Sequence, residues 1–192
     1  MTFLLDLLQG AGLAAANGIR PFLPALLAGI LASADLGLDF DDTSFAFLEH
    51  PAFLGVLAAA AAAGVAIARK PLASEQATLA LGAVGIALGV LLAAGSLDDR
   101  SSTWWPALPV GLLCAALGFV VARSLLARVR GRLDDDVAGA LPLYAEGIAL
   151  AVAALSILFP PLALVALGLL IRLQLGGKRR EGEKYAGLRI LR

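Results

Sequence analysis

The sequence predicts an all-α membrane protein, a polytopic bundle of helices. Of its 192 residues, 60% are hydrophobic and 16% are charged, and the mean hydropathy is +0.88. Soluble domains carry about 45–50% apolar and about 25% charged residues, so both values favour a bilayer. There are six hydrophobic regions, at residues 3–34, 51–68, 76–96, 104–122, 137–158 and 161–175. We expect a single transmembrane domain over residues 1–175 and a basic cytoplasmic tail over 176–192.

The first region is too long for one straight span and too short for two. Thirty residues of helix measure about 45 Å, whereas the hydrocarbon core is about 30 Å thick. The middle of the region reads ANGIRPFLP from Ala16 to Pro24. Asn-Gly favours a helix end, and proline favours the first turn of the next helix. We therefore expect two half-length helices, 3–16 and 21–34, around a broken or re-entrant linker at Asn17–Pro24. A signal peptide is not expected at 3–16, which lacks a basic start.

The later regions are simpler to interpret. Residues 76–96, 104–122 and 137–158 each fit a span of about 20 residues, 51–68 is just long enough, and 161–175 is short. Phe159-Pro160-Pro161 predicts a sharp turn between the last two regions, because proline lacks an N–H and restricts the residue before it.

The charged residues between the regions predict the topology. Loop 35–50 is acidic and contains no lysine or arginine, and loop 97–103 contains Asp98, Asp99 and a single arginine. Thirteen of the fifteen basic residues fall in the intervening loops, at the end of the last region or in the tail. The positive-inside rule then predicts a multi-pass protein of the bacterial inner membrane with both termini in the cytoplasm. The first region must cross once for this to hold.

A weak internal similarity favours an inverted 3+3 repeat. Residues 21–27 read PFLPALL and residues 106–112 read PALPVGL, each at the start of an apolar run. Inverted repeats are common in transporters. Because proline, alanine and leucine are abundant in this chain, chance similarity is an open alternative.

Two ionisable residues lie inside apolar regions and define the candidate site. Arg20 would stand beside the start of the second half-helix, where free N–H groups attract anions. Glu146 lies near the expected midplane, where a carboxylate needs a partner or marks a pathway. We expect Arg20 and Glu146 to pair, and we assign Asn17, Gly18, Arg20, Tyr144 and Glu146 to substrate binding. The alternatives are an interfacial Arg20 that snorkels to the headgroups and a purely structural ion pair.

No motif for catalysis or for a cofactor occurs. Cys114 is the only cysteine and His50 the only histidine, which excludes an intramolecular disulfide and a multi-histidine metal site. Loop 35–50 lacks the ligand spacing of a calcium loop, so a solvated acidic surface is favoured. We expect no enzyme activity, no metal, no cofactor and no nucleic-acid partner. The expected partners are the bilayer, anionic inner-leaflet lipids at the tail and a second copy packed through small-residue faces.

The motif Gly18-Ile19-Arg20-Pro21-Phe22-Leu23-Pro24 resembles a bacterial integral-membrane family called domain of unknown function 4126. That family shows an early Gly-x-Arg-x-aromatic-Leu-Pro motif, and Pro51 after the acidic loop also fits it. The resemblance implies a multi-span fold and a membrane location but no activity. The stretch Ala68-Arg69-Lys70-Pro71 lacks the carboxylates that the family often has there.

A second resemblance is shorter. Residues 20–29 are similar to an Arg-x-Phe-x-Pro-x-x-x-Ala-Gly-type segment of the DedA lipid-transporter superfamily, which places buried arginines and re-entrant helices around a lipid phosphate.

The function we predict is a small transporter or flippase-like carrier of an anionic solute or lipid headgroup. The alternative is a non-transporting scaffold that oligomerises through Gly/Ala helix faces, and a lipid-modifying enzyme is least favoured.

Overall fold

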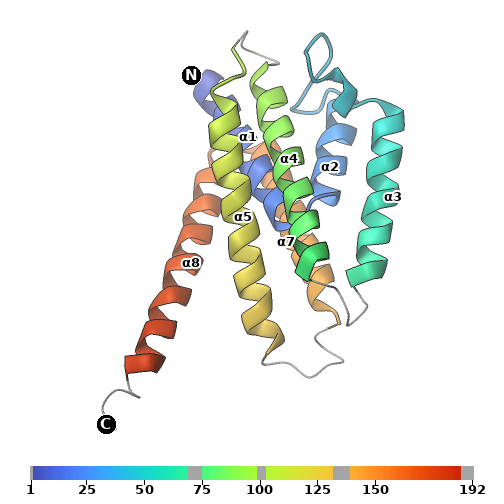
Figure 1. The fold of residues 1–192 in the computed structure, drawn as a ribbon. Helices are drawn as coiled ribbons and strands as arrows, with labels where there is room; N and C mark the ends of the chain where they lie inside the picture. Colours follow the sequence, from blue (N-terminus) through green and yellow to red (C-terminus); the bar gives the residue numbers. More distant parts are fainter. Residues whose placement is uncertain (1, 69–74, 99–102, 132–138, 187–192) are drawn as a thin grey trace.

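The described residues form a bundle of α-helices with one short 3₁₀-helix (Figure 1). The computed structural model describes residues 2–68, 75–98, 103–131 and 139–186. The elements, in chain order, are α1 (Thr2–Ile19), α2 (Leu23–Ala32), η1 (Ala46–Leu48), α3 (Pro51–Ala68), α4 (Glu75–Asp98), α5 (Ala107–Arg130), α7 (Leu141–Leu158) and α8 (Leu162–Ala186). No strand occurs within these ranges, in agreement with the predicted all-α class.

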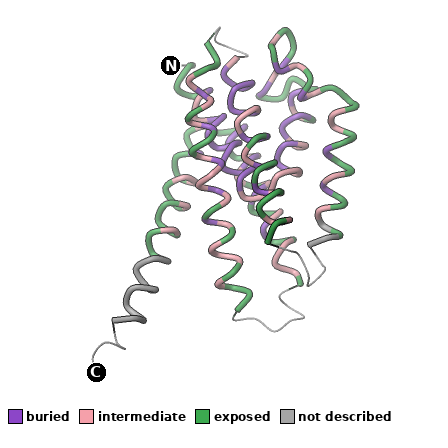
Figure 2. The backbone as a smooth tube through the Cα atoms, viewed as in Figure 1, coloured by how far each residue is buried: buried purple, intermediate pink, exposed green. Residues whose placement is uncertain are grey.

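Among the described residues, three helices, α4, α5 and α7, are long and apolar enough to span a membrane. The first hydrophobic region forms two helices and each of the others forms one, and α1, α2, α3 and α8 contain shorter apolar stretches. Large apolar side chains point outwards, for example Leu113 with 70% and Leu158 with 67% of the residue exposed. Figure 2 shows that the buried residues lie towards the middle of the bundle, and many of these residues are alanines. Small residues inside and large apolar residues outside are typical of helices that pack within lipid.

Helix α1 lies at the centre of the bundle and contacts α2, α4, α5, α7 and α8. Its backbone approaches its neighbours closely at glycines. A Cβ atom on Gly18 would overlap the carbonyl of Ala115 in α5, and one on Gly118 would overlap the carbonyl of Ala15. Because glycine has no Cβ, these helices come closer than any other residue would allow.

The small-residue stripe of α4 is used inside the chain. Gly85 packs against the carbonyl of Asn17, Gly89 against Ala14, and Gly82 against the ring of Phe119. The sequence left open whether this stripe packs within one chain or between two copies. In the structure these three glycines face other helices of the same chain.

The predicted break in the first region is present, but it lies later than expected. Helix α1 continues to Ile19 and α2 begins at Leu23, so Asn17 and Gly18 are helical and not part of the linker. Proline causes the break: Pro21 has no N–H and its ring interferes with the carbonyl four residues earlier. The N–H of Arg20 still donates to the carbonyl oxygen of Ala16 at 3.0 Å, as the last bond of α1.

Helices α1 and α2 form a hairpin whose two outer ends lie at the same end of the bundle (Figure 1). Near the start of α1, the carbonyl oxygen of Asp6 accepts a hydrogen bond from Ser96 Oγ at 3.3 Å, close to the end of α4. Gln9 Nε2 donates to the carbonyl of Gly37, in the acidic loop, at 2.8 Å. The far end of α1 reaches Gly85, near the middle of α4. The hairpin therefore enters from the acidic end and turns back inside the bundle.

The expectation that both termini share one side does not agree with this arrangement. Helix α1 starts at the acidic end, whereas α8 ends at the opposite end (Figure 1). The expectation required residues 3–34 to cross once, but the hairpin returns α2 to the end where α1 began. The positive-inside rule could not reveal this, because residues 1–19 contain no lysine or arginine.

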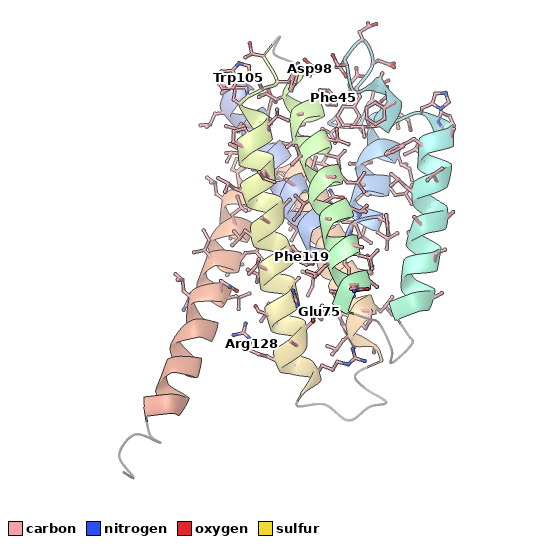
Figure 3. All side chains as sticks on the ribbon, viewed as in Figure 1. Phe45, Glu75, Asp98, Trp105, Phe119 and Arg128 are labelled. Carbon is pink, nitrogen blue, oxygen red and sulfur yellow. The ribbon has the colours of Figure 1, made fainter. Side chains whose placement is uncertain are left out.

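Different residues mark the two ends of the bundle: Asp98, Trp105 and Phe45 lie at one end, and Glu75 and Arg128 lie towards the other (Figure 3). At the acidic end, Asp98 Oδ2 accepts a hydrogen bond from the Ser44 N–H at 3.1 Å, and the rings of Phe45 and Trp104 meet edge-to-face at 5.9 Å. At the opposite end, Arg123 Nη2 lies 2.7 Å from Glu75 Oε1. Which of these ends faces the cytoplasm stays a prediction from the loop charges.

Two further expectations fare differently. The structure does not support the inverted repeat: Pro21 precedes a 10-residue helix in mid-bundle, whereas Pro106 precedes the 24-residue α5 at the acidic end. The division into a membrane domain over 1–175 and a basic tail over 176–192 stays a prediction, and α8 continues across this boundary to Ala186. The contact of the tail with inner-leaflet lipids stays a prediction, and residues 187–192 lie outside the described part of the chain.

Candidate functional site

The candidate site lies at the inner tip of the hairpin. Arg20 occupies the linker between α1 and α2, and the neighbouring residue Pro21 lies next to Gly85, near the middle of α4. Gly118, near the middle of α5, faces the Ile19 backbone from the other side. The arginine is thus placed deep within the bundle by two backbones that approach at glycines. Only 18% of its side chain is exposed.

Arg20 pairs with Glu146, as the sequence predicted. Arg20 Nε lies 3.7 Å from Glu146 Oε1, and 13% of the glutamate side chain is exposed. This distance makes an ion pair without a hydrogen bond. Within the described chain, Arg20 Nε and Glu146 Oε2 are buried and have no hydrogen-bond partner. The pair is therefore close enough for attraction, yet each partner keeps an unused polar atom.

Glu146 lies in the second turn of α7, which begins at Leu141. The sequence placed it deeper, near the midplane, by counting from Val137, which lies outside the described residues. At 1.5 Å per residue, Glu146 is about 8 Å along the axis from the start of α7. At 3.7 Å and an effective dielectric constant of about 20, the attraction between the pair amounts to about 4 kcal/mol before desolvation is subtracted.

Asn17 is the third polar member of the site. It lies one turn before Arg20 in α1, and residues three apart share a helix face. The residue is fully buried, and its Nδ2 donates to the carbonyl of Leu13 at 2.9 Å. Its Oδ1 atom has no hydrogen-bond partner in the described part of the chain. We call Asn17, Arg20 and Glu146 the hairpin-tip site.

Two residues predicted to bind substrate do not belong to the hairpin-tip site. Gly18 is a packing residue, because its Cα lies against the Ala115 backbone and no ligand could reach it there. Tyr144 is 70% exposed on α7, two residues before Glu146. Residues two apart on a helix point to different faces, so Tyr144 cannot share the face of Glu146 that meets Arg20.

The ends of two helices meet at the hairpin-tip site. The carbonyls at the end of α1 carry a partial negative charge, and the N–H groups at the start of α2 carry a partial positive one. Phe22, the residue before α2, makes no side-chain capping bond. The start of α2 therefore keeps backbone donors that no side chain caps.

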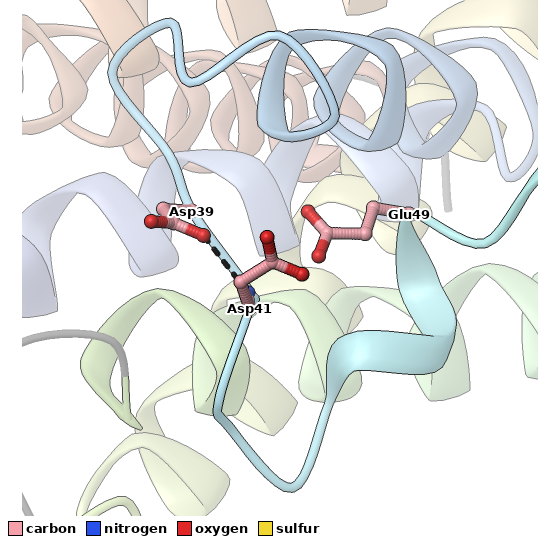
Figure 4. A group of neighbouring side chains, drawn as sticks. All are labelled: Asp39, Asp41 and Glu49. Carbon is pink, nitrogen blue, oxygen red and sulfur yellow. Dashed lines mark hydrogen bonds between the residues drawn. The ribbon is translucent and has the colours of Figure 1, made fainter.

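The structure also reveals an acidic cluster that sequence reasoning described only as a solvated surface (Figure 4). One carboxylate oxygen from each of Asp39, Asp41 and Glu49 lies within 4.8 Å of the other two. Asp39 Oδ1 accepts a hydrogen bond from the Asp41 N–H at 2.8 Å. Burial raises the pKa of Glu49, and the hydrogen bond and charge of Asp41 raise it further. The signal in the sequence was the run of acidic residues, but their meeting depends on η1, which turns the chain back.

Comparison with known proteins identifies one family. A family model described as "Domain of unknown function (DUF4126)" matches residues 7–176, which include the described elements from α2 to α7 and the larger part of α1 and of α8. No curated protein and no solved structure matches the chain. The shorter resemblance to the DedA superfamily finds no support in these comparisons.

Proposed function

Since the chain belongs to the DUF4126 family, whose description assigns no activity, we propose from the hairpin-tip site that it is a small membrane carrier. Its cargo would be an anionic solute or the anionic group of a lipid headgroup. Transport, not catalysis, is the proposed activity. The bacterial cytoplasmic membrane is the proposed location.

The Arg20–Glu146 pair is the observation that carries this proposal. A structural pair buried for stability gains most when it is hydrogen-bonded and its remaining polar atoms are satisfied. This pair is 3.7 Å apart, lacks a hydrogen bond and leaves Arg20 Nε unused. The guanidinium therefore keeps a donor for an incoming phosphate or carboxylate, for which its forked N–H groups are well suited.

The position of the pair supports the same proposal. In discontinuous membrane helices, irregular backbone near the middle of the bundle commonly holds substrate, and half-helix ends face its charges. The α1–α2 hairpin has this form, with Arg20 at its turn. Glu146, on α7, would act as a counter-charge that holds Arg20 when cargo is absent and releases it when cargo binds.

The proposed orientation follows from the charges. The acidic end would face outwards and the end with Arg123, Arg128 and Arg130 would face the cytoplasm. The α1–α2 hairpin would then be re-entrant from the outer side, and α3, α4, α5, α7 and α8 would cross. This puts the start of α1 outside and the end of α8 in the cytoplasm, in contrast to the expectation from the sequence that both termini are cytoplasmic.

The test is flux in proteoliposomes. We would reconstitute the chain, then measure uptake of radiolabelled anionic solutes, phosphate and phosphoethanolamine among them, and, separately, the movement between leaflets of phospholipids that carry a fluorophore on the acyl chain and an unmodified headgroup. Arg20→Gln should reduce the active flux at least tenfold. The matched control is Arg123→Gln, since Arg123 is also an arginine in an ion pair but lies at the basic end with 44% of its side chain exposed. Equal flux in both variants would refute the role of Arg20.

A scaffold is the second candidate, and one observation favours it. Helix α3 lies at the edge of the bundle, and Ala58, Ala59, Ala62 and Ala63 are exposed on it. Small residues of this kind let helices of two copies approach. If the scaffold is correct, Ala59→Leu should break oligomers on size-exclusion chromatography, and Arg20→Gln should change stability without changing any flux.

A further inference from the structure

The hairpin-tip site has unpaired atoms of two kinds. Arg20 Nε is a hydrogen-bond donor, whereas Asn17 Oδ1 and Glu146 Oε2 are acceptors. All three atoms are buried, and none has a hydrogen-bond partner in the described ranges of the chain. Because an unpaired buried polar group is costly, a ligand that pairs all three gains more than one that pairs only some.

A purely anionic ligand pairs only one of these kinds. A phosphate would accept from Arg20 but would leave Asn17 Oδ1 and Glu146 Oε2 without donors. It would also lie a few ångströms from the Glu146 carboxylate, and two like charges at that distance repel. A purely cationic ligand would be repelled by Arg20 and would leave Arg20 Nε without an acceptor. The site is thus complementary to neither a lone anion nor a lone cation.

The two helix ends at the linker have the same double character. Pro21 has no N–H, so the Asn17 carbonyl lacks its usual donor from within the helix. The end of α1 therefore favours a cation. The start of α2, where Phe22 makes no side-chain cap, favours an anion. A ligand with both charges finds a matching helix end for each of them.

We propose that the ligand of the hairpin-tip site is a zwitterion, with a phosphate or carboxylate and a primary ammonium in the same small molecule or headgroup. The inference rests on the proposed function and names its substrate class. The anionic group would accept from Arg20, and the ammonium would donate to Glu146 and Asn17. Free phosphoethanolamine, a free amino acid and the headgroup of an ethanolamine phospholipid share this chemistry.

Binding to the purified full-length chain in detergent tests the proposal. The free probes are phosphoethanolamine, glycine, inorganic phosphate, ethanolamine and phosphocholine, titrated by calorimetry. One of the two zwitterions with a primary ammonium should bind at least about tenfold tighter than phosphate or ethanolamine. Phosphocholine should be weaker than phosphoethanolamine, because its quaternary ammonium has no N–H to donate. A parallel series in phosphatidylcholine nanodiscs with added ethanolamine phospholipid distinguishes a lipid source from a free one.

Variants link the binding to the hairpin-tip site. Arg20→Gln and Glu146→Gln should each weaken the zwitterion about tenfold or more, and Asn17→Ala should weaken it less, since it removes one neutral acceptor. Arg123→Gln should leave it unchanged. A variant that removes only one of the two charges could unfold the chain. In that case the double variant Arg20→Gln/Glu146→Gln, which removes both charges, and Asn17→Ala, which keeps both, test whether the zwitterion binds at the hairpin-tip site.

The failing outcomes separate the two proposals. If phosphate binds as tightly as every zwitterion, free or in lipid, and still binds Glu146→Gln, the site recognises an anion alone, so the zwitterion is refuted while the carrier survives. If a zwitterion binds as predicted but no probe is transported, the carrier is refuted while the ligand class stands. If no zwitterion binds in either setting, the inference is wrong.

Discussion

The contact between α1 and α5 places the hairpin tip, and one substitution tests it directly. Gly18→Ala would put a methyl group onto the backbone of α5, 2.8 Å from the carbonyl carbon of Ala115 and still closer to its oxygen. The obstructing atoms belong to a helix backbone and cannot rotate away. The matched control is Gly168→Ala in α8, where a Cβ would meet nothing within 4 Å.

Comparison with Gly168→Ala isolates the cost of the steric overlap at Gly18. Glycine-to-alanine gains about 1 kcal/mol of helix propensity at either position, so this gain cancels in the comparison. What remains is the cost of overpacking at Gly18, about 1–3 kcal/mol. We expect Gly18→Ala to be less stable than Gly168→Ala by that amount. The free energy of unfolding would be measured by SDS titration in mixed micelles, with fluorescence from Trp104 and Trp105 as the signal.

The reasoning fails if the two variants differ by less than about 0.5 kcal/mol, the usual error of such comparisons. Gly118→Ala examines the same contact from α5, where the added methyl would meet the carbonyl of Ala15. It should be destabilising to a similar degree. A stable Gly118→Ala together with a stable Gly18→Ala would mean that α1 does not lie in close contact with α5.

A double-mutant cycle of Arg20→Gln and Glu146→Gln should give a coupling energy of about 1–2 kcal/mol in the free energy of unfolding. This is less than the gross attraction, because the pair lacks a hydrogen bond and is partly exposed. A coupling energy near zero would contradict the ion pair. Glu49 has a pKa raised in the folded state, so the fold binds a proton that the unfolded chain releases, and stability should fall as the pH rises through that pKa. Glu49→Gln should flatten this pH dependence, and an unchanged slope in thermal unfolding would contradict it. Glu75→Gln should cost at most about 1 kcal/mol, because 73% of the Glu75 side chain and 44% of the Arg123 side chain are exposed. A larger loss by SDS titration would contradict a surface pair.

The sequence predicted those features that depend on composition and on single strong residues. Apolar length marks the helices, Pro21 alone is enough to interrupt the first region, and the charges of Arg20 and Glu146 each need a partner in an apolar setting. These are local or pairwise constraints. They hold wherever the helices finally pack.

What the sequence could not supply comes from packing between distant segments. Asn17-Gly18 is a common helix end, yet here it stays helical, because Asn17 bonds back to Leu13 and Gly18 fits against α5. The direction of the first region was undetermined for a related reason. An apolar stretch of that length either crosses once or doubles back. The hydrogen bond from Gln9, in α1, to Gly37, which follows α2, shows that it doubles back. Tyr144 is different, since its spacing from Glu146 already excluded it.

The hairpin links the fold to the proposed chemistry. If residues 3–34 crossed the bundle as one broken span, Arg20 would be a kink residue with helix continuing on both sides in the same direction. Because α2 turns back, the end of α1 and the start of α2 meet at one place and present opposite partial charges there. Glu146 then adds an acceptor from a third helix. The same return that sets the start of α1 and the end of α8 at opposite ends of the bundle therefore creates the paired charges on which the zwitterion inference depends.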